Sequence, residues 1–149
     1  ELVLASGYAP HFGMPLELSD AYYADVDVLQ LRVHADEGLV FCCDANATIG
    51  TEKSHLPHQS RGPNGLNYTN AAGRRFLSWL QSNSLASASS FFESGLACNA
   101  TWFHPCSRLP HLPGHIVVRT HDLKRAVKCS KLGCMLVDSD HFPLKIASP

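Results

Sequence analysis

The pattern of apolar and polar residues predicts a strand, a helix and a second strand in the first third of the chain. Residues 2–9 form an apolar run that Pro10 ends. Residues 16–35 repeat apolar side chains at helical spacing, and Gly38 is expected to cap this helix. The repeating positions are Tyr22, Val26, Leu29 and Val33. Residues 39–43 are again apolar, so the order of elements indicates a layered α/β fold.

A second helix and several short strands are expected after a long loop. Residues 47–70 are rich in Gly, Pro and Asn, and loops of this length in compact domains are often functional. Thr69 or Asn70 is expected to begin a helix that ends at Asn83, because apolar side chains recur on one helical face between them. Further strands are expected at residues 85–92, 99–103 and 115–119, and after the polar cluster 138–141.

Composition and charge narrow the class of protein. A length of 149 residues favours one domain over residues 1–149, and 45% hydrophobic residues suffice for a core. The net charge of −1 forces no basic face, so charge gives no argument for nucleic-acid binding. No apolar run reaches the length of a membrane helix, so we expect no membrane partner. Because the chain starts at Glu1 in the middle of an apparent strand, it is expected to be a fragment of something longer.

The six cysteines favour free thiols over a disulfide framework or a zinc site. No two of them form a C-x-x-C pair, so the sequence does not indicate a zinc ribbon or a thioredoxin-like motif. Cys42 and Cys43 lie inside an apolar run and are expected to act as small buried hydrophobes. A reducing, intracellular compartment is therefore expected, with the nucleus as one option.

Polar side chains stand where the predicted strands end. Asp44 and Asn46 are two residues apart, so on an extended chain they point the same way. Such a pair suits a hydrated cation, a water nucleophile or a phosphate, although it could equally make only turn hydrogen bonds. Tyr8 ends the first strand, and the pair Asp140–His141 follows later in the chain. Because layered α/β folds collect ligands at one sheet edge, these groups could bind a divalent metal and a phosphate and activate water.

The order of five short motifs resembles the endonuclease/exonuclease/phosphatase superfamily, over the C-terminal part of its domain. The motifs are Tyr8-Ala9-Pro10, Cys43-Asp44-Ala45-Asn46, Gly62-Pro63-Asn64-Gly65, Thr101-Trp102 and Ser139-Asp140-His141. The Gly62–Gly65 loop, with Asn70 and Gly73 after it, looks most like the endonuclease domains of LINE-type non-LTR retrotransposons.

This resemblance implies a fold, a reaction and partners. The expected fold is a partial four-layer α/β sandwich, in which two packed mixed β-sheets are flanked by helices and the N-terminal strands are missing. The expected reaction is hydrolysis of DNA phosphodiesters with Mg²⁺, or with Mn²⁺. The expected parent polypeptide also carries a reverse transcriptase region.

The resemblance also implies roles for individual residues. Tyr8 is expected to contact the scissile phosphate, Asp44 to orient or activate the attacking water, and Asn46 to stabilise the transition state. Asp140 is expected to contribute to metal binding, and His141 to contact phosphate or transfer a proton. Thr101 and Trp102 are expected to bind substrate.

Departures from the family pattern predict impaired activity. The family's metal-binding Glu lies in strands that come before the Tyr-Ala-Pro stretch. This sequence does not contain those strands. His115 stands where the family places the Asp that orients the terminal histidine, and His11 stands where these endonucleases often have Asn. Two alternatives therefore stay open: a non-catalytic remnant or binding module of the same fold, and a sugar or inositol phosphatase of the superfamily.

Overall fold

A computed structural model describes residues 1–51, 59–93, 100–126, 128–132 and 139–147. Its main sheet has four strands in the order β1-β2-β6-β3, formed by Leu2–Tyr8, Gly38–Asp44, Gly114–Arg119 and Leu85–Ser87. β1 runs parallel to β2, whereas β6 is antiparallel to both of its neighbours. Two smaller antiparallel pairs complete the strands, β4 (Trp102–Phe103) with β5 (Pro110–His111) and β7 (Lys128–Lys131) with β8 (Leu144–Ala147).

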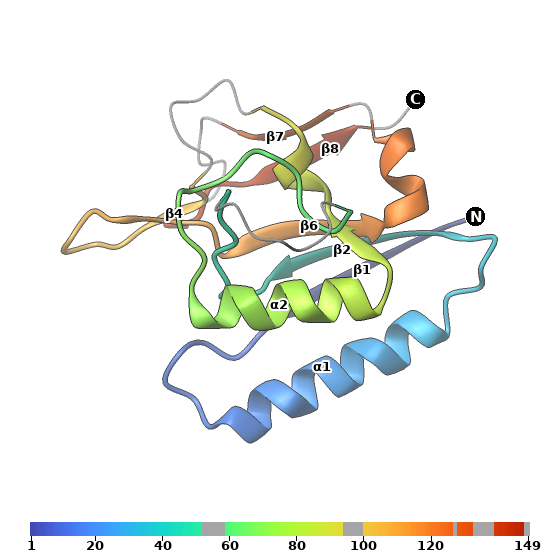
Figure 1. Cartoon of the computed structure of the whole chain (residues 1–149), viewed down its shortest axis with the longest axis horizontal. Coiled ribbons are helices and arrows are strands. Elements are labelled where there is room, and N and C mark those ends of the chain that lie inside the picture. The colour runs from blue at the N-terminus through green and yellow to red at the C-terminus, as the bar shows by residue number, and fades with distance from the viewer. Residues whose placement is uncertain (52–58, 94–99, 127, 133–138, 148–149) are drawn as a thin grey trace.

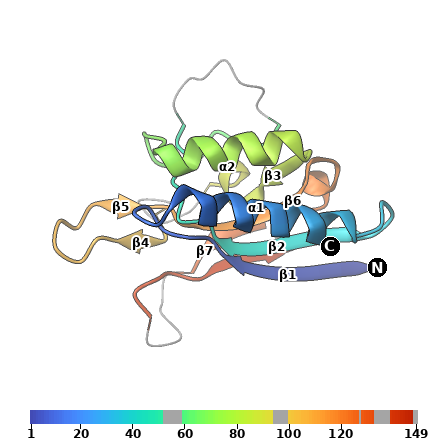
Figure 2. The ribbon, with the colours of Figure 1, turned by 90° about the horizontal axis from the view of Figure 1, so that it is seen from below.

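Helices cover one face of the main sheet and the β7–β8 pair covers part of the other. Figure 1 shows α1 (Leu16–Leu31) and α2 (Ala71–Ser82) side by side below the sheet, with β7 and β8 above it. Figure 2 shows that both helices run roughly along the strands. The short 3-10 helices η1 (Ala88–Phe91) and η2 (Thr120–Arg125) flank β6. The predicted α/β class is confirmed, with a four-strand mixed sheet, smaller two-strand sheets and helices.

The core lies between the helices and the sheet. Phe41 from β2 and Val117 from β6 are buried against the apolar face of α2, where Phe76 and Leu80 are 1% and 0% exposed. Burial of side chains of this size stabilises the fold by about 1.5–3 kcal/mol each. The core therefore fixes α2 over the centre of the sheet.

The α2 helix begins where the sequence predicts. Asn70 is its N-cap, and the Asn70 side chain accepts hydrogen bonds from the backbone N–H groups of Gly73 and Thr48, at 2.7 and 3.1 Å. Gly73 lies against the Thr48 carbonyl so closely that an added Cβ would meet its oxygen at 1.9 Å. The helix start is thus locked to the segment that follows β2.

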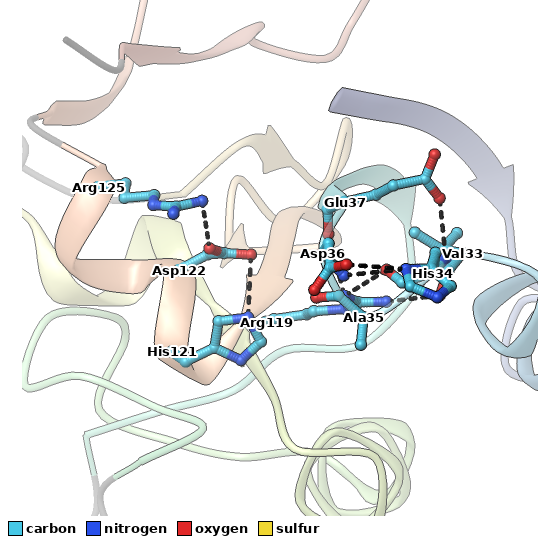
Figure 3. A network of polar contacts seen from close by, with 9 residues as sticks. All are labelled: Val33, His34, Ala35, Asp36, Glu37, Arg119, His121, Asp122 and Arg125. Atoms are coloured by element: carbon cyan, nitrogen blue, oxygen red, sulfur yellow. Dashed lines mark hydrogen bonds and ion pairs between the residues drawn. The ribbon is translucent and has the colours of Figure 1, made fainter. Parts of the chain in front are cut away.

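The end of α1 differs from the prediction. The helix stops at Leu31, and Gly38 begins β2 instead of capping the helix. The backbone carbonyls of residues 33–35 and 37 accept hydrogen bonds from the guanidinium of Arg119, at 2.8–3.1 Å. Figure 3 shows this side chain reaching from the end of β6 into the loop after α1. Arg119 therefore anchors the loop after α1, whereas the carbonyls of Leu29 and Gln30 at the helix end accept local hydrogen bonds from Arg32 N and Val33 N.

Two further predictions need correction. The expected strand over residues 85–92 ends at Ser87 and continues as η1, because Ser90 Oγ donates to the Ser87 carbonyl at 2.6 Å and turns the chain. Cys42 is exposed, whereas Cys43 is buried, since consecutive side chains of a strand point to opposite faces. Cys42, Cys43, Cys106 and Cys129 are free thiols, and the other two cysteines lie outside the described residues.

The described ranges contain no helix whose length and hydrophobicity would let it cross a membrane.

Candidate active site

Parallel pairing places Tyr8 and Asp44 at the same sheet edge. The register pairs Tyr8 with Asp44, the last residues of β1 and β2. Ala9 N donates to the Asp44 carbonyl at 2.8 Å, which holds the two strand ends together beyond the ladder. The Tyr8 side chain is exposed, and the Asp44 side chain is 19% exposed. A phenol and a carboxylate therefore face the same space from neighbouring strands.

Asn46 makes a turn with Asp44 and still reaches this edge. Its backbone N–H donates to Asp44 Oδ1 at 2.9 Å, and its φ of 47° lies in the left-handed region that Asn tolerates. Asn46 Nδ2 donates to the Ala9 carbonyl at 2.8 Å, which ties the residue to the segment after β1. The two interpretations of the Asp44–Asn46 pair are thus compatible, because the turn is what fixes the two side chains.

His141 stands between two carboxylates. Its Nδ1 lies 3.7 Å from Asp44 Oδ2, and its Nε2 lies 3.9 Å from Asp140 Oδ1. Trp102 Nε1 donates to Asp140 Oδ2 at 2.7 Å, and this hydrogen bond lowers the pKa of the Asp140 carboxyl below its ordinary value. A β-bridge between Trp102 and His141 joins their backbones. Residues from the middle and the end of the chain are thereby brought to the end of β2.

One open cavity of about 290 Å³ joins these groups. Six of the predicted site residues line it: Tyr8, Asp44, Asn46, Trp102, Asp140 and His141. The sequence-based expectation that these positions meet at one sheet edge agrees with this geometry.

The structure does not bring Thr101 and His115 into the cavity wall. Thr101 is 1% exposed, and its Oγ1 accepts a hydrogen bond from Gly114 N at 3.2 Å. His115 is also 1% exposed and contacts the Ala47 carbonyl and Ser87 Oγ, at 2.8 and 3.0 Å. Both side chains support the start of β6 from inside the fold.

The cavity is also lined by residues to which sequence reasoning gave no role in the site, among them His11, Thr48 and His111. His11 had a signal, because it follows the Tyr-Ala-Pro stretch. Thr48 and His111 had none, since Thr48 lies in the segment after β2 and His111 in the short strand β5, whose course the sequence does not specify. Partial burial, and secondarily the proximity of His104, lowers the pKa of His111. Tyr68 Oη lies 3.2 Å from His111 Nδ1 and fixes that ring in the wall.

The described residues do not by themselves fit a resident metal ion. Mg²⁺ takes oxygen ligands in near-octahedral geometry, usually from one or two carboxylates together with phosphate oxygens and water. The carboxylates of Asp44 and Asp140 lie on opposite sides of the His141 ring and are engaged by Asn46 and Trp102. Across the described ranges, no three His, Cys, Asp or Glu side chains are arranged to hold a metal ion. A metal ion bound here would therefore depend on ligands from substrate phosphate and water.

Comparison with known proteins identifies the fold. The sequence matches no protein-family model and no curated protein. Among solved structures, the 3′ phosphatase NExo from Neisseria, bound to product DNA hairpin, superposes with a TM-score of 0.63 at 14% sequence identity. The match covers 92% of this chain and 56% of that one. The chain has the fold of the exonuclease/endonuclease/phosphatase enzymes.

A second solved structure gives the same result. The 3′-5′ exonuclease NExo from Neisseria meningitidis matches with a TM-score of 0.63 and 14% identity, over 91% of this chain. The chain spans 56% of the length of both solved chains. At this level of identity the comparison establishes the exonuclease/endonuclease/phosphatase fold, and the activity has to be argued from the cavity.

Proposed function

We propose that the cavity at the end of β1 and β2 binds and hydrolyses a DNA phosphodiester. One observation carries the proposal: Tyr8, Asp44, Asn46 and His141 line the same cavity although they come from three separate parts of the chain. Two solved neighbours of the same fold, described as a 3′ phosphatase bound to a DNA product and as a 3′-5′ exonuclease, support phosphoester hydrolysis on DNA.

The groups around the cavity suit attack of water on a phosphate. Asp44 can act as a general base, accepting a proton from a water molecule held against its carboxylate. The water oxygen then bonds to phosphorus, the P–O bond to the leaving strand breaks, and the leaving oxygen takes a proton from solvent. His141 lines the same cavity, with its Nδ1 3.7 Å from Asp44 Oδ2, so a ring N–H can donate a hydrogen bond to a non-bridging oxygen of a phosphate held there. The Tyr8 hydroxyl and the second N–H of the Asn46 amide are further donors for the charge that develops on the phosphate.

The finer assignment rests on the motifs in the sequence. The Gly62–Gly65 loop supports an endonuclease of the LINE-type retrotransposon kind, for which Mg²⁺ or Mn²⁺ is the expected cofactor. In that case, the parent polypeptide would carry a reverse transcriptase region and act on DNA in the nucleus. We infer that the 149-residue chain alone nicks DNA slowly, because its described residues do not complete a metal site.

A plasmid-nicking assay tests this proposal. Supercoiled plasmid is incubated with the chain in Mg²⁺, in Mn²⁺ and in EDTA, and the nicked form is measured over time. We expect slow nicking that EDTA abolishes and that Asp44→Asn lowers by about 100-fold or more. The matched control is Asp36→Asn, because the Asp36 side chain is 91% exposed on another loop. Nicking that persists unchanged in Asp44→Asn would place the reaction elsewhere.

A second candidate is a DNA-binding module without catalysis. It is favoured by the engaged carboxylates of Asp44 and Asp140 and by the absence of a three-ligand metal group among the described residues. Binding of a labelled duplex in fluorescence anisotropy, without any nicking in either metal, would support this module. Release of phosphate from inositol phosphates would instead favour the phosphatase alternative.

A further inference from the structure

A second cavity lies beside the candidate active site. It has a volume of about 330 Å³ and is formed by the loop after β1 and by the first turns of α1 and α2. Its walls are largely apolar or aromatic and include Phe12, Met14, Leu16, Tyr23 and Ala72. Phe12 is 87% exposed, so an aromatic ring projects from the rim of this cavity into solvent.

The loop that carries Phe12 is a hydrogen-bonded turn. Met14 N donates to the His11 carbonyl at 3.1 Å, and His11 Nδ1 donates to the Phe12 carbonyl at 2.9 Å. Gly13 has a φ of 110°, a conformation that side chains rarely adopt. Because these features fix the backbone on both sides of Phe12, little backbone entropy remains to be lost when a ligand contacts its ring.

The two cavities share a wall. His11 lines both of them. Asp44 and Asn46 face the candidate active site, whereas Ala45 between them faces the second cavity. The start of α2 also separates the two cavities, because Asn70 lines the first cavity and Ala71 lines the second. A ligand whose phosphate occupies the first cavity can therefore extend an attached group into the second.

The charges in the second cavity favour a flat, uncharged group over another phosphate. Arg75 is the cation in its wall, and its guanidinium forms an ion pair with Asp20. The same guanidinium lies 5.8 Å from the centre of the Tyr23 ring, as in a cation–π contact. Its positive charge is thus already matched, and what the wall offers a ligand is apolar surface and the exposed ring of Phe12.

We propose that this second cavity is a nucleobase subsite, in which Phe12 stacks on a base of the strand whose phosphate lies beside Asp44. Stacking on an aromatic side chain tolerates any base, because every base has a π-face. Phe12 is then a positioning residue, since it orients the strand without touching the reacting atoms. The inference rests on the proposed function, because the proposed function is what identifies the ligand as a nucleic acid.

Two labelled single strands of equal length and charge test the subsite. One carries thymines and the other carries tetrahydrofuran abasic residues, and fluorescence anisotropy measures the affinity of the 149-residue chain for each. We expect the base-containing strand to bind on the order of ten-fold more tightly. Phe12→Ala should remove that difference and leave the affinity for the abasic strand unchanged. The matched control is Leu31→Ala, because Leu31 is 81% exposed at the far end of α1.

A spectroscopic readout separates stacking from a general loss of affinity. 2-Aminopurine in the strand should be quenched on binding to the native chain and to Leu31→Ala, and less quenched by Phe12→Ala at saturation. Equal affinity for both strands, or a Phe12→Ala variant that weakens both equally, overturns the subsite and leaves the proposed function standing. If neither strand binds, the subsite fails, and the plasmid-nicking assay decides separately whether the proposed function stands.

Discussion

At the scale of single residues, His115 shows how a position next to the site is used for structure. A carbonyl oxygen only accepts, so His115 Nε2–H donates to Ala47 O, and Nδ1 accepts from the Ser87 hydroxyl. These two contacts suit the neutral imidazole. Burial lowers the pKa of His115 below its ordinary value, with the Phe76 ring 4.8 Å away, centre to centre. The residue therefore ties β6 to the end of β2 as an uncharged group.

The neutral His115 makes stability depend on pH. Its pKa is lower in the folded chain than the value of about 6.5 in the unfolded chain, so the unfolded chain takes up the proton first as the pH falls. The free energy of unfolding should decrease below about pH 6.5, by up to about 1.4 kcal/mol per pH unit for this one group. Urea denaturation at several pH values measures the slope.

Variants isolate the contribution of this histidine to the slope. His115→Gln should flatten the pH dependence below about pH 6.5 relative to the native chain, because it removes the titrating group. His121→Gln is the matched control, since the His121 side chain is 64% exposed. Parallel curves for the native chain and His115→Gln would show that His115 does not carry the effect.

The positions of site residues could be predicted from the sequence where the residue stands at the end of a strand. Asp44 and Tyr8 follow apolar runs directly, so their place at a sheet edge follows from the pattern alone. His111 reaches the cavity from the β4–β5 pair, and Thr48 reaches it from the segment after β2. Their positions depend on tertiary hydrogen bonds, such as the one between Leu112 N and Thr48 Oγ1 at 3.3 Å, which leave no local signal.

At the scale of elements, the sequence predicts the start or end of an element correctly where a recognisable capping residue fixes it. The α2 helix begins at Asn70 and ends before Asn83 as predicted, because Asn70 caps its own helix. The α1 helix ends at Leu31 without the glycine cap that was expected, and Arg119, far along the sequence, holds the loop that follows it. The strand predicted over residues 85–92 is shortened by serine side chains that bond to the backbone. Propensity alone does not register such contacts.

Removing the α2 cap should destabilise the protein. Asn70→Ala leaves the Gly73 and Thr48 backbone N–H groups without their acceptor, so we expect a loss of about 1–2 kcal/mol in the free energy of unfolding. Thermal and urea denaturation measure the change. Asn67→Ala, on the exposed loop before the helix, should lie within about 0.5 kcal/mol of the native chain. A loss of the same size in both variants would count against the cap.

At the scale of the whole molecule, the order of the strands holds distant parts of the chain together. The sequence predicts most of the strands but not the order β1-β2-β6-β3, because nothing local distinguishes β3 from β6 as a partner of β2. Arg119 then joins the layers, since it extends from β6 to the loop between α1 and β2.

Losing the Arg119 side chain should loosen that connection. Its guanidinium donates to four backbone carbonyls at 2.8–3.1 Å, so Arg119→Ala should lower the free energy of unfolding by about 1.5–3 kcal/mol. Hydrogen exchange should accelerate most over residues 33–37. Arg32→Ala is the control, because Arg32 is exposed on the same loop. An unchanged exchange rate in this loop would refute the anchoring role.

The place of β6 in the sheet also governs how the chain reaches its native state. The strand lies between β2 and β3, yet it comes late in the chain, and Val40 pairs with Val118. During synthesis, β1, α1, β2, α2 and β3 all precede the strand that joins the two halves of the sheet. Pairings across such sequence separations slow folding, because closing a long loop costs conformational entropy before the strand contacts can form and offset that cost. A nascent chain that stops before residue 114 therefore exposes the unpaired edges of β2 and β3 to other chains.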